Sequence, residues 1–156
     1  RIHCRKMSFD RGIELLWNTQ FNECLRTFEE VKSEEPLIAS VHIALVHSVL
    51  ALISEDAERV ETSFEHLTRA IDACTVVDND LGTHNSMMTR LLKVNPLGST
   101  HDEEAQLNDA QQLQLMTART FLCELTGMKM ALQFRTGAFL TGAYSLRSTW
   151  KLFQRH

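Results

Sequence analysis

The chain has 156 residues, which is enough for one domain with its own hydrophobic core. Hydrophobic residues make up 44% and charged residues 23%, as in ordinary soluble domains, and 6 glycines with 2 prolines are too few for the many turns of an all-β protein. The net charge of -4 argues against a general nucleic-acid-binding surface, which would be strongly basic.

The first predicted unit is a hairpin of two helices over residues 8–20 and 21–35. In the second helix, apolar residues recur at steps of three and four, which places them on one helix face: Phe21, Cys24, Leu25, Phe28 and Val31. Pro36 follows. Because the residue before a proline resists helical geometry, we expect this helix to end there and the next to begin at the proline.

The second predicted hairpin covers residues 37–76. Its first helix, 37–53, is apolar nearly all round, which predicts neighbours on most sides. It is shorter than the ~20 apolar residues of a membrane span and contains Ser and His, so we interpret it as a buried helix. Asp56 is the predicted N-cap of the second helix. The inward face of that helix should comprise Val60, Phe64, Leu67, Ala70, Ile71 and Cys74.

Residues 77–101 are predicted to be a long connection with a short helix near 85–94, because they are rich in turn-forming residues. A connection of this length inside a domain is usually functional or mobile.

The third predicted hairpin covers residues 102–155. Thr100 and Glu103 fit a capping box at the start of a long helix that runs to about Phe134. Its inward face should comprise Ala110, Leu113, Ala118, Phe121, Leu122, Leu125, Met128 and Leu132. A break near 135–137 leads to a last helix, 138–155, with an inward stripe of Phe139, Ala143, Leu146, Trp150 and Phe153.

Two residues of the last helix need their own explanation. Gly142 costs roughly 1 kcal/mol relative to Ala inside a helix, which favours a close approach of two helices over a backbone contact with a ligand. Arg147 is expected to extend into solvent or to pair with an acid of the long helix, and binding of a partner's carboxylate is the alternative.

A repeat is visible in the first two hairpins. Gly12 and Leu15 in one helix, followed by Cys24, Phe28, Val31 and Pro36, fit the tetratricopeptide pattern of small and large residues. A second copy follows 39 positions later, where Ser63, Leu67 and Ala70 stand at the offsets of Cys24, Phe28 and Val31, and Val60 at that of Phe21.

Three parts of the chain add a family resemblance. They are residues 12–25, the apolar helix 37–53 that ends in 54–56 together with the end of its partner helix at 68–74, and, most strongly, residues 139–153. They resemble the tetratricopeptide repeat protein 39 family, which includes the fungal inclusion-body-clearance proteins. The chain departs from that family at Thr19, where a turn glycine is usual, and at Thr141, where a lysine is common.

The resemblance implies an all-α stack of three antiparallel hairpins, an α-α superhelix, and a non-enzymatic scaffold or adaptor for protein partners. It implies a place in the cytoplasm or nucleus, a link to lipid homeostasis, inclusion clearance or protein turnover, and an N-terminal portion of a longer protein. In such folds the first helix of each pair lines a concave groove. The groove candidates here are Lys6, Ile13, Trp17, Ser48, Leu52 and Glu55. Trp17 is the preferred anchor, and its alternative is core packing.

Other interpretations remain open. A basic last helix, with Arg147, Lys151 and Arg155 beside apolar residues, would suit a peripheral membrane module or one that binds the surface of a lipid droplet or organelle. If the stack is truncated, residues 138–155 would expose an apolar face and mediate self-association. An enzyme or a helical ligand carrier is the third interpretation.

The sequence shows little that points to catalysis. His42 and His47 are five positions apart, on different sides of a helix, and no metal-ligand or nucleotide-binding motif is present. The four cysteines show no close pairing, so we expect free thiols: Cys4, Cys24, Cys74 and Cys123. We therefore predict no enzyme activity, no cofactor and no metal site.

Overall fold

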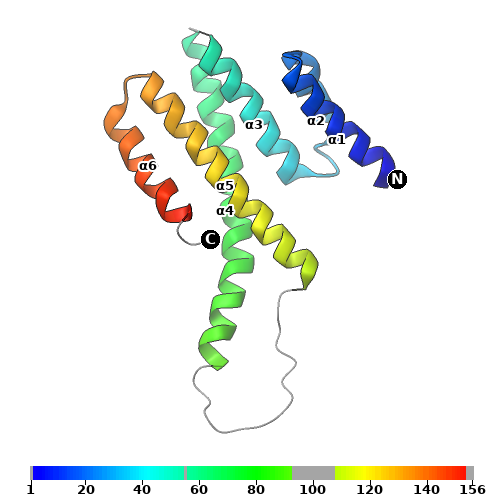
Figure 1. The fold of residues 1–156 in the computed structure, drawn as a ribbon, viewed down its shortest axis with the longest axis vertical. Coiled ribbons are helices and arrows are strands. Elements are labelled where there is room, and N and C mark those ends of the chain that lie inside the picture. Colours follow the sequence, from blue (N-terminus) through cyan, green and yellow to red (C-terminus); the bar gives the residue numbers. More distant parts are fainter. Residues whose placement is uncertain (1, 55, 93–107, 154–156) are drawn as a thin grey trace.

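The computed structural model describes residues 2–54, 56–92 and 108–153, and their side chains at 10–54, 56–81, 108–147 and 150. Over these residues the chain forms six helices and no strand, which confirms the predicted all-α class (Figure 1). The helices are α1 (Ile2–Trp17), α2 (Phe21–Val31), α3 (Pro36–Ile53), α4 (Ala57–Leu92), α5 (Asp109–Arg135) and α6 (Phe139–Phe153).

Helices that follow one another along the chain pack side by side, and α3 lies in the middle of the fold (Figure 1). It contacts α2, α4 and α5. The short connection between α3 and α4 turns the chain back on itself. Ser48 and Ser63, on either side of it, therefore lie opposite each other, and their hydroxyl oxygens are 3.0 Å apart.

The first helix pair differs slightly from its predicted bounds. Helix α1 already begins at Ile2, and it ends at Trp17 because Thr19 takes a positive φ of 59°. Helix α2 ends at Val31, before its predicted end at residue 35. Pro36 stands in the first turn of α3, as the sequence predicts. A proline fits there because the first turn of a helix leaves its N–H groups without helical acceptors.

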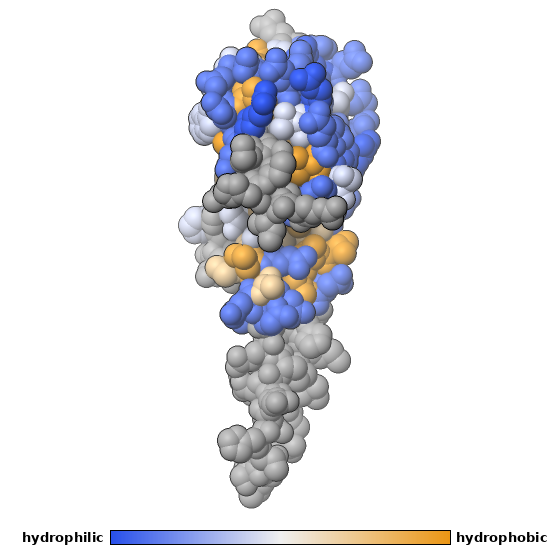
Figure 2. All heavy atoms as spheres, turned by 90° about the vertical axis from the view of Figure 1, so that its right-hand side faces the viewer, coloured by the Kyte–Doolittle hydropathy of each residue, from blue (hydrophilic) through white to orange (hydrophobic). Residues whose placement is uncertain are grey.

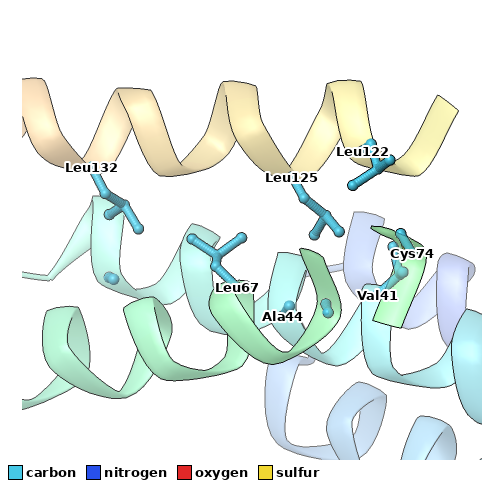
Figure 3. Close-up of a cluster of buried hydrophobic side chains, with 9 residues drawn as sticks. Val41, Ala44, Leu67, Cys74, Leu122, Leu125 and Leu132 are labelled. Carbon is cyan, nitrogen blue, oxygen red and sulfur yellow. The ribbon is translucent and has the colours of Figure 1, made fainter. Parts of the chain in front are cut away.

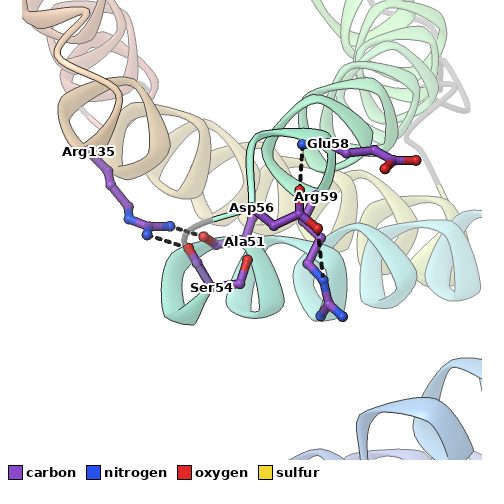
Figure 4. A network of polar contacts seen from close by, with 6 residues as sticks. All are labelled: Ala51, Ser54, Asp56, Glu58, Arg59 and Arg135. Atoms are coloured by element: carbon purple, nitrogen blue, oxygen red, sulfur yellow. Dashed lines mark hydrogen bonds and ion pairs between the residues drawn. The ribbon is translucent and has the colours of Figure 1, made fainter.

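Helix α4 is longer than predicted. The predicted N-cap Asp56 is confirmed, since its Oδ1 accepts a hydrogen bond from the backbone N–H of Glu58 at 3.0 Å (Figure 4). The predicted end at residue 76 is wrong, because the helix continues to Leu92. Turn-forming residues such as Asp and Gly cost at most about 1 kcal/mol each in a helix. Contacts such as the 2.6 Å ion pair between Asp78 and Arg119 of α5 offset that cost. The remainder of the predicted connection, 93–101, lies outside the described residues.

Helix α5 begins later than predicted. Asn108 has extended backbone geometry (φ -64°, ψ 161°) and forms a capping box with Gln111, so a continuous helix from Thr100 is wrong. Thr100 itself lies outside the described residues. As a consequence, Ala110 and Leu113 stand in the exposed first turns rather than on the inward face. The predicted break after α5 is confirmed at Thr136 and Gly137, whose φ is +78°.

The interior consists of two clusters of buried side chains. The larger joins α3, α4 and α5 and contains Val41, Ala44, Ala51, Leu67, Ala70, Cys74, Leu122, Leu125 and Leu132 (Figure 3). The smaller joins α1, α2 and α3 and contains Leu15, Cys24, Phe28, Ile43 and Val46. His42 lies between them, with its ring centroid 5.1 Å from that of Phe28 and 5.9 Å from that of Phe121.

Close helix approach in the smaller cluster depends on Gly12. A Cβ atom at this position would lie 2.6 Å from Cζ of Phe28, whose side chain is fully buried. The thiol of Cys24 donates a hydrogen bond to the carbonyl oxygen of Gly12 at 3.2 Å. The first two helices therefore touch at the positions where the repeat pattern requires small residues.

Arg135, the last residue of α5, links that helix to the end of α3. Its guanidinium donates hydrogen bonds to the carbonyl oxygens of Ala51 and Ser54 (Figure 4). The last carbonyls of a helix have no partner within it and carry a partial negative charge, so a cation is favourable here.

Among the described residues, α3 is the one helix long and apolar enough to cross a membrane, judged by length and composition alone. In the fold, however, it contributes more buried side chains than exposed ones, which agrees with its interpretation as a core helix.

Candidate binding surface

The outer side of α6 carries a group of large apolar side chains in contact with solvent. Five of them are between 50% and 81% exposed: Phe139, Leu140, Tyr144, Leu146 and Trp150. Monomeric proteins rarely expose so many large apolar side chains together unless the surface binds something. This face of α6 is therefore the main candidate for a binding surface.

The predicted inward stripe of the last helix is wrong in its direction. Phe139, Ala143, Leu146 and Trp150 share one side of the helix, as predicted, but that side faces solvent. Phe153, the last residue of the stripe, lies outside the residues whose side chains are described. A surface helix normally turns its large apolar residues toward the core, so α6 is arranged the opposite way.

Small residues explain this arrangement, because they let α6 lie close to α5. A Cβ atom on Gly142 would lie 3.1 to 3.2 Å from the ring of Phe134, so the predicted close helix approach at this glycine is confirmed. One turn later, Ser145 donates a hydrogen bond to Oε1 of the buried Gln133 at 2.7 Å. The inner side of α6 is thus narrow and partly polar, and the larger side chains remain outside.

The predicted basic residues of this helix are only partly described. Arg147 is exposed and lies among the apolar residues of the outer side. The side chains of Lys151 and Arg155 lie outside the described part of the chain.

The described groove candidates differ in exposure. Trp17 is 81% exposed at the end of α1, so its alternative role in the core is wrong, whereas Ile13 is half-buried against the smaller cluster. Leu52 is half-buried against the larger cluster. Ser48 is wrong as a groove residue. It is fully buried, and its hydroxyl donates to the carbonyl oxygen of Ala44 at 2.7 Å.

Two groove candidates, Lys6 and Glu55, have side chains outside the described residues. Next to Trp17, a shallow hollow of about 480 Å³ is lined mainly by polar residues: Asp10, Arg11, Glu14, Leu15, Asn18 and Gln20. On the face shown in Figure 2, most of the coloured residues are hydrophilic, and the apolar ones form separate patches. Leu113 and Met116, each 67% exposed, belong to the beginning of α5.

The described cysteines are free, buried thiols. Burial raises the pKa of Cys24 and of Cys74 to about 11, and it also raises the pKa of Cys123. A thiol with such a pKa is protonated at neutral pH and is a poor nucleophile or metal ligand.

Two histidines form a stacked pair between α3 and α4. The rings of His47 and His66 lie 4.3 Å apart and are inclined by 5°. Burial lowers the pKa of both rings. The neighbouring His66 lowers the pKa of His47 further, and the nearby Arg69 lowers that of His66. Within the described part of the chain, no three His, Cys, Asp or Glu side chains are grouped so that they could hold a metal ion.

Leu140 and Tyr144 belong to this surface but were not singled out from the sequence. They lie four positions apart, directly beside the predicted stripe, and this spacing could have revealed them.

No protein-family model, curated protein or solved structure matches this chain. The fold and the surface therefore define the class on their own: an all-helical protein that exposes a large apolar face on one helix.

Proposed function

We propose that this chain is a non-enzymatic scaffold or adaptor that binds other proteins, built as a tetratricopeptide-type stack of three helical hairpins. The observation that carries the proposal is the outer face of α6, where five large apolar side chains on one helix meet solvent instead of joining the two buried clusters. A surface of this kind is stable in water but gains free energy when a partner covers it.

The tetratricopeptide assignment is supported by equivalent packing in the two copies of the repeat. Cys24 contacts the first helix of its pair, and Ser63, 39 positions later, contacts the first helix of the next pair. Phe28 and Leu67, the large residues that follow them by four positions, are both fully buried. Residues at equal offsets therefore occupy equivalent packing positions in both helix pairs, as expected of a repeat.

The resemblance to the tetratricopeptide repeat protein 39 family extends the proposal. On that basis the protein acts in the cytoplasm or nucleus, or at the surface of a lipid droplet or organelle, in lipid homeostasis, inclusion clearance or protein turnover. Its partners would be proteins rather than nucleic acids.

A second candidate function is binding to an anionic membrane through α6. It is favoured by the exposure of Leu146 and Trp150 beside the cationic Arg147. An enzyme with a cysteine nucleophile has less support, because the described thiols are buried and the raised pKa of Cys24 and Cys74 keeps them protonated.

Affinity capture from cells, followed by mass spectrometry, tests the scaffold. Trp17→Ala and Trp150→Ala each remove one exposed aromatic side chain from a different part of the surface. Thr68→Ala is the control, because Thr68 is exposed on α4 away from both tryptophans in sequence. We expect at least one tryptophan variant to lose partners that the wild type and the control retain. If the wild type, both tryptophan variants and the control capture the same partners, neither the surface at Trp17 nor the one at Trp150 binds partner proteins.

A further inference from the structure

Helix periodicity places the small residue Ala143 among larger neighbours on the outer face of α6, and we call this position the hole. Ala143 forms the floor, and the residues three and four positions before and after it form the rim: Phe139, Leu140, Leu146 and Arg147. All five residues are exposed. In paired helices, a hole bounded by four such residues accepts one large side chain from the facing helix.

The position of Arg147 limits what can cover this face. At about 100° per residue, Phe139, Leu146 and Trp150 lie on one edge of the apolar arc and Leu140 and Tyr144 on the other. Arg147 lies between the two edges, about 80° from Phe139. A helix that lies flat on a membrane keeps its cations at the border of the apolar side, whereas this geometry would press Arg147 toward the hydrocarbon.

A second copy of the same helix is also a poor match. Residues 139–153 contain Arg147 and Lys151 but no Asp or Glu. Two copies that meet through this face would bring like charges together without an acid to pair with them, which is unfavourable at an interface. A carboxylate on the partner would instead pair with Arg147 in the centre of the face.

The extent of the face fits a single helix. Its five large apolar side chains are 50% to 81% exposed and all come from α6, so the face is about one helix wide. The three aromatic ones alone, Phe139, Tyr144 and Trp150, offer roughly 400 Å² of mostly apolar surface. A stable interface between two globular proteins needs about 800 Å² on each side, so this face matches a slender partner better than a broad one.

We propose, on the basis of the scaffold function above, that the outer face of α6 binds an amphipathic helix of a partner protein. A large apolar side chain of that helix enters the hole over Ala143, and a Glu or Asp beside it pairs with Arg147. The expected ligand is therefore a helix with an apolar stripe and acidic residues beside it. Ala143 recognises its shape and Arg147 its charge.

Two synthetic helical peptides of about three heptads test this inference. Both carry the same leucine stripe, one with glutamates and the other with lysines beside the stripe, and both are used at concentrations where they are monomeric. Binding to the purified protein is followed by fluorescence anisotropy of the labelled peptide. We expect the glutamate peptide to bind at least about tenfold more tightly than the lysine peptide.

Variants of the protein separate shape from charge. Ala143→Trp fills the hole and should lower the affinity for the glutamate peptide by at least about tenfold. Arg147→Glu should make the lysine peptide bind more tightly than the glutamate peptide. Thr141→Trp is the matched control, because Thr141 is exposed on the other side of α6, and it should leave binding unchanged. Circular dichroism confirms that each variant is folded.

Several results would overturn the inference: equal binding of both peptides, no binding of either, or equal effects of Ala143→Trp and Thr141→Trp. If the protein dimerises in sedimentation equilibrium and Arg147→Glu strengthens the dimer, the occupant of the face is a second copy of the chain. If the protein co-sediments with phosphatidylserine vesicles and Ala143→Trp does not reduce this binding, the face binds a membrane. If the peptides fail while Trp17→Ala still loses cellular partners, this inference falls and the scaffold stands.

Discussion

Gly12 provides the sharpest test of the packing between α1 and α2. In an exposed helix, Gly→Ala stabilises by about 1 kcal/mol through helix propensity. Here the new Cβ would lie 2.6 and 2.7 Å from two ring carbons of Phe28, far inside the usual 3.5–4.0 Å contact distance between carbon atoms. The ring is fully buried and has His42 nearby, so it has little room to move. Overpacking of this kind costs about 1–3 kcal/mol. We expect Gly12→Ala to forfeit the propensity gain and to destabilise the protein by up to about 2 kcal/mol net.

Urea unfolding followed by circular dichroism measures this change, and another glycine supplies the control. Apart from the backbone of α5 and the two chain neighbours, no atom lies within 4 Å of the position that a Cβ would take at Gly127. Gly127→Ala should therefore stabilise by about 1 kcal/mol. Phe28→Leu should reduce the cost of Gly12→Ala, with a coupling energy of at least about 1 kcal/mol. If Gly12→Ala raises the urea midpoint as Gly127→Ala does, the close approach of α1 and α2 is refuted.

Three further predictions concern stability. Phe28→Ala should cost about 3–5 kcal/mol in urea unfolding, since its ring is fully buried, and a loss below about 1 kcal/mol would contradict the repeat alignment. Thr19→Gly should raise stability by about 0.5–1 kcal/mol in thermal melts, because a positive φ strains a β-branched residue, and a lower melting temperature would speak against this strain. Burial lowers the pKa of three histidines in the folded state, so the unfolded chain binds more protons and stability falls as the pH drops from about 7 to 5. A urea midpoint that does not change over this range would rule out these buried neutral rings: His42, His47 and His66.

The sequence predicted the helical class and most of the interior because apolar periodicity is a strong local signal. Phe28, Leu67 and Cys74 are fully buried on the helix faces assigned to them. Pro36 and Asp56 stand where a helix-starting residue and an N-cap were expected. Such signals act over one or two turns, and the structure retains them.

Helix ends far from proline were harder to predict. The capping-box pattern is short, and both Thr100 with Glu103 and Asn108 with Gln111 fit it, so the sequence alone could not choose between them. The residues near Asp78 are predicted from the sequence to belong to a connection, because several of them favour turns. Within the fold the carboxylate of Asp78 pairs with Arg119, a residue 41 positions away, which no local pattern reveals.

The binding surface was only half predictable, for a physical reason. Periodicity shows which side chains of α6 share a side of the helix, but the direction of that side depends on what α5 offers. The ring of Phe134 lies so close to Gly142 that even a Cβ there would be tightly packed, and Gln133 accepts a hydrogen bond from the hydroxyl of Ser145. The wide apolar side of α6 therefore faces outward.

The division of the interior into two clusters has a consequence for local opening of the fold. Helices α3, α4 and α5 each contact the other two, and Arg135 also holds the end of α5 to that of α3, so none of them can separate alone. Helix α1 packs mainly on α2, and this pair is attached to α3 through the smaller cluster. Amide hydrogens of α1 and α2 should therefore exchange with solvent through a cheaper opening than those of the three central helices. The exposed Trp17 belongs to the part that opens first, so a ligand that holds it would slow hydrogen exchange throughout that pair.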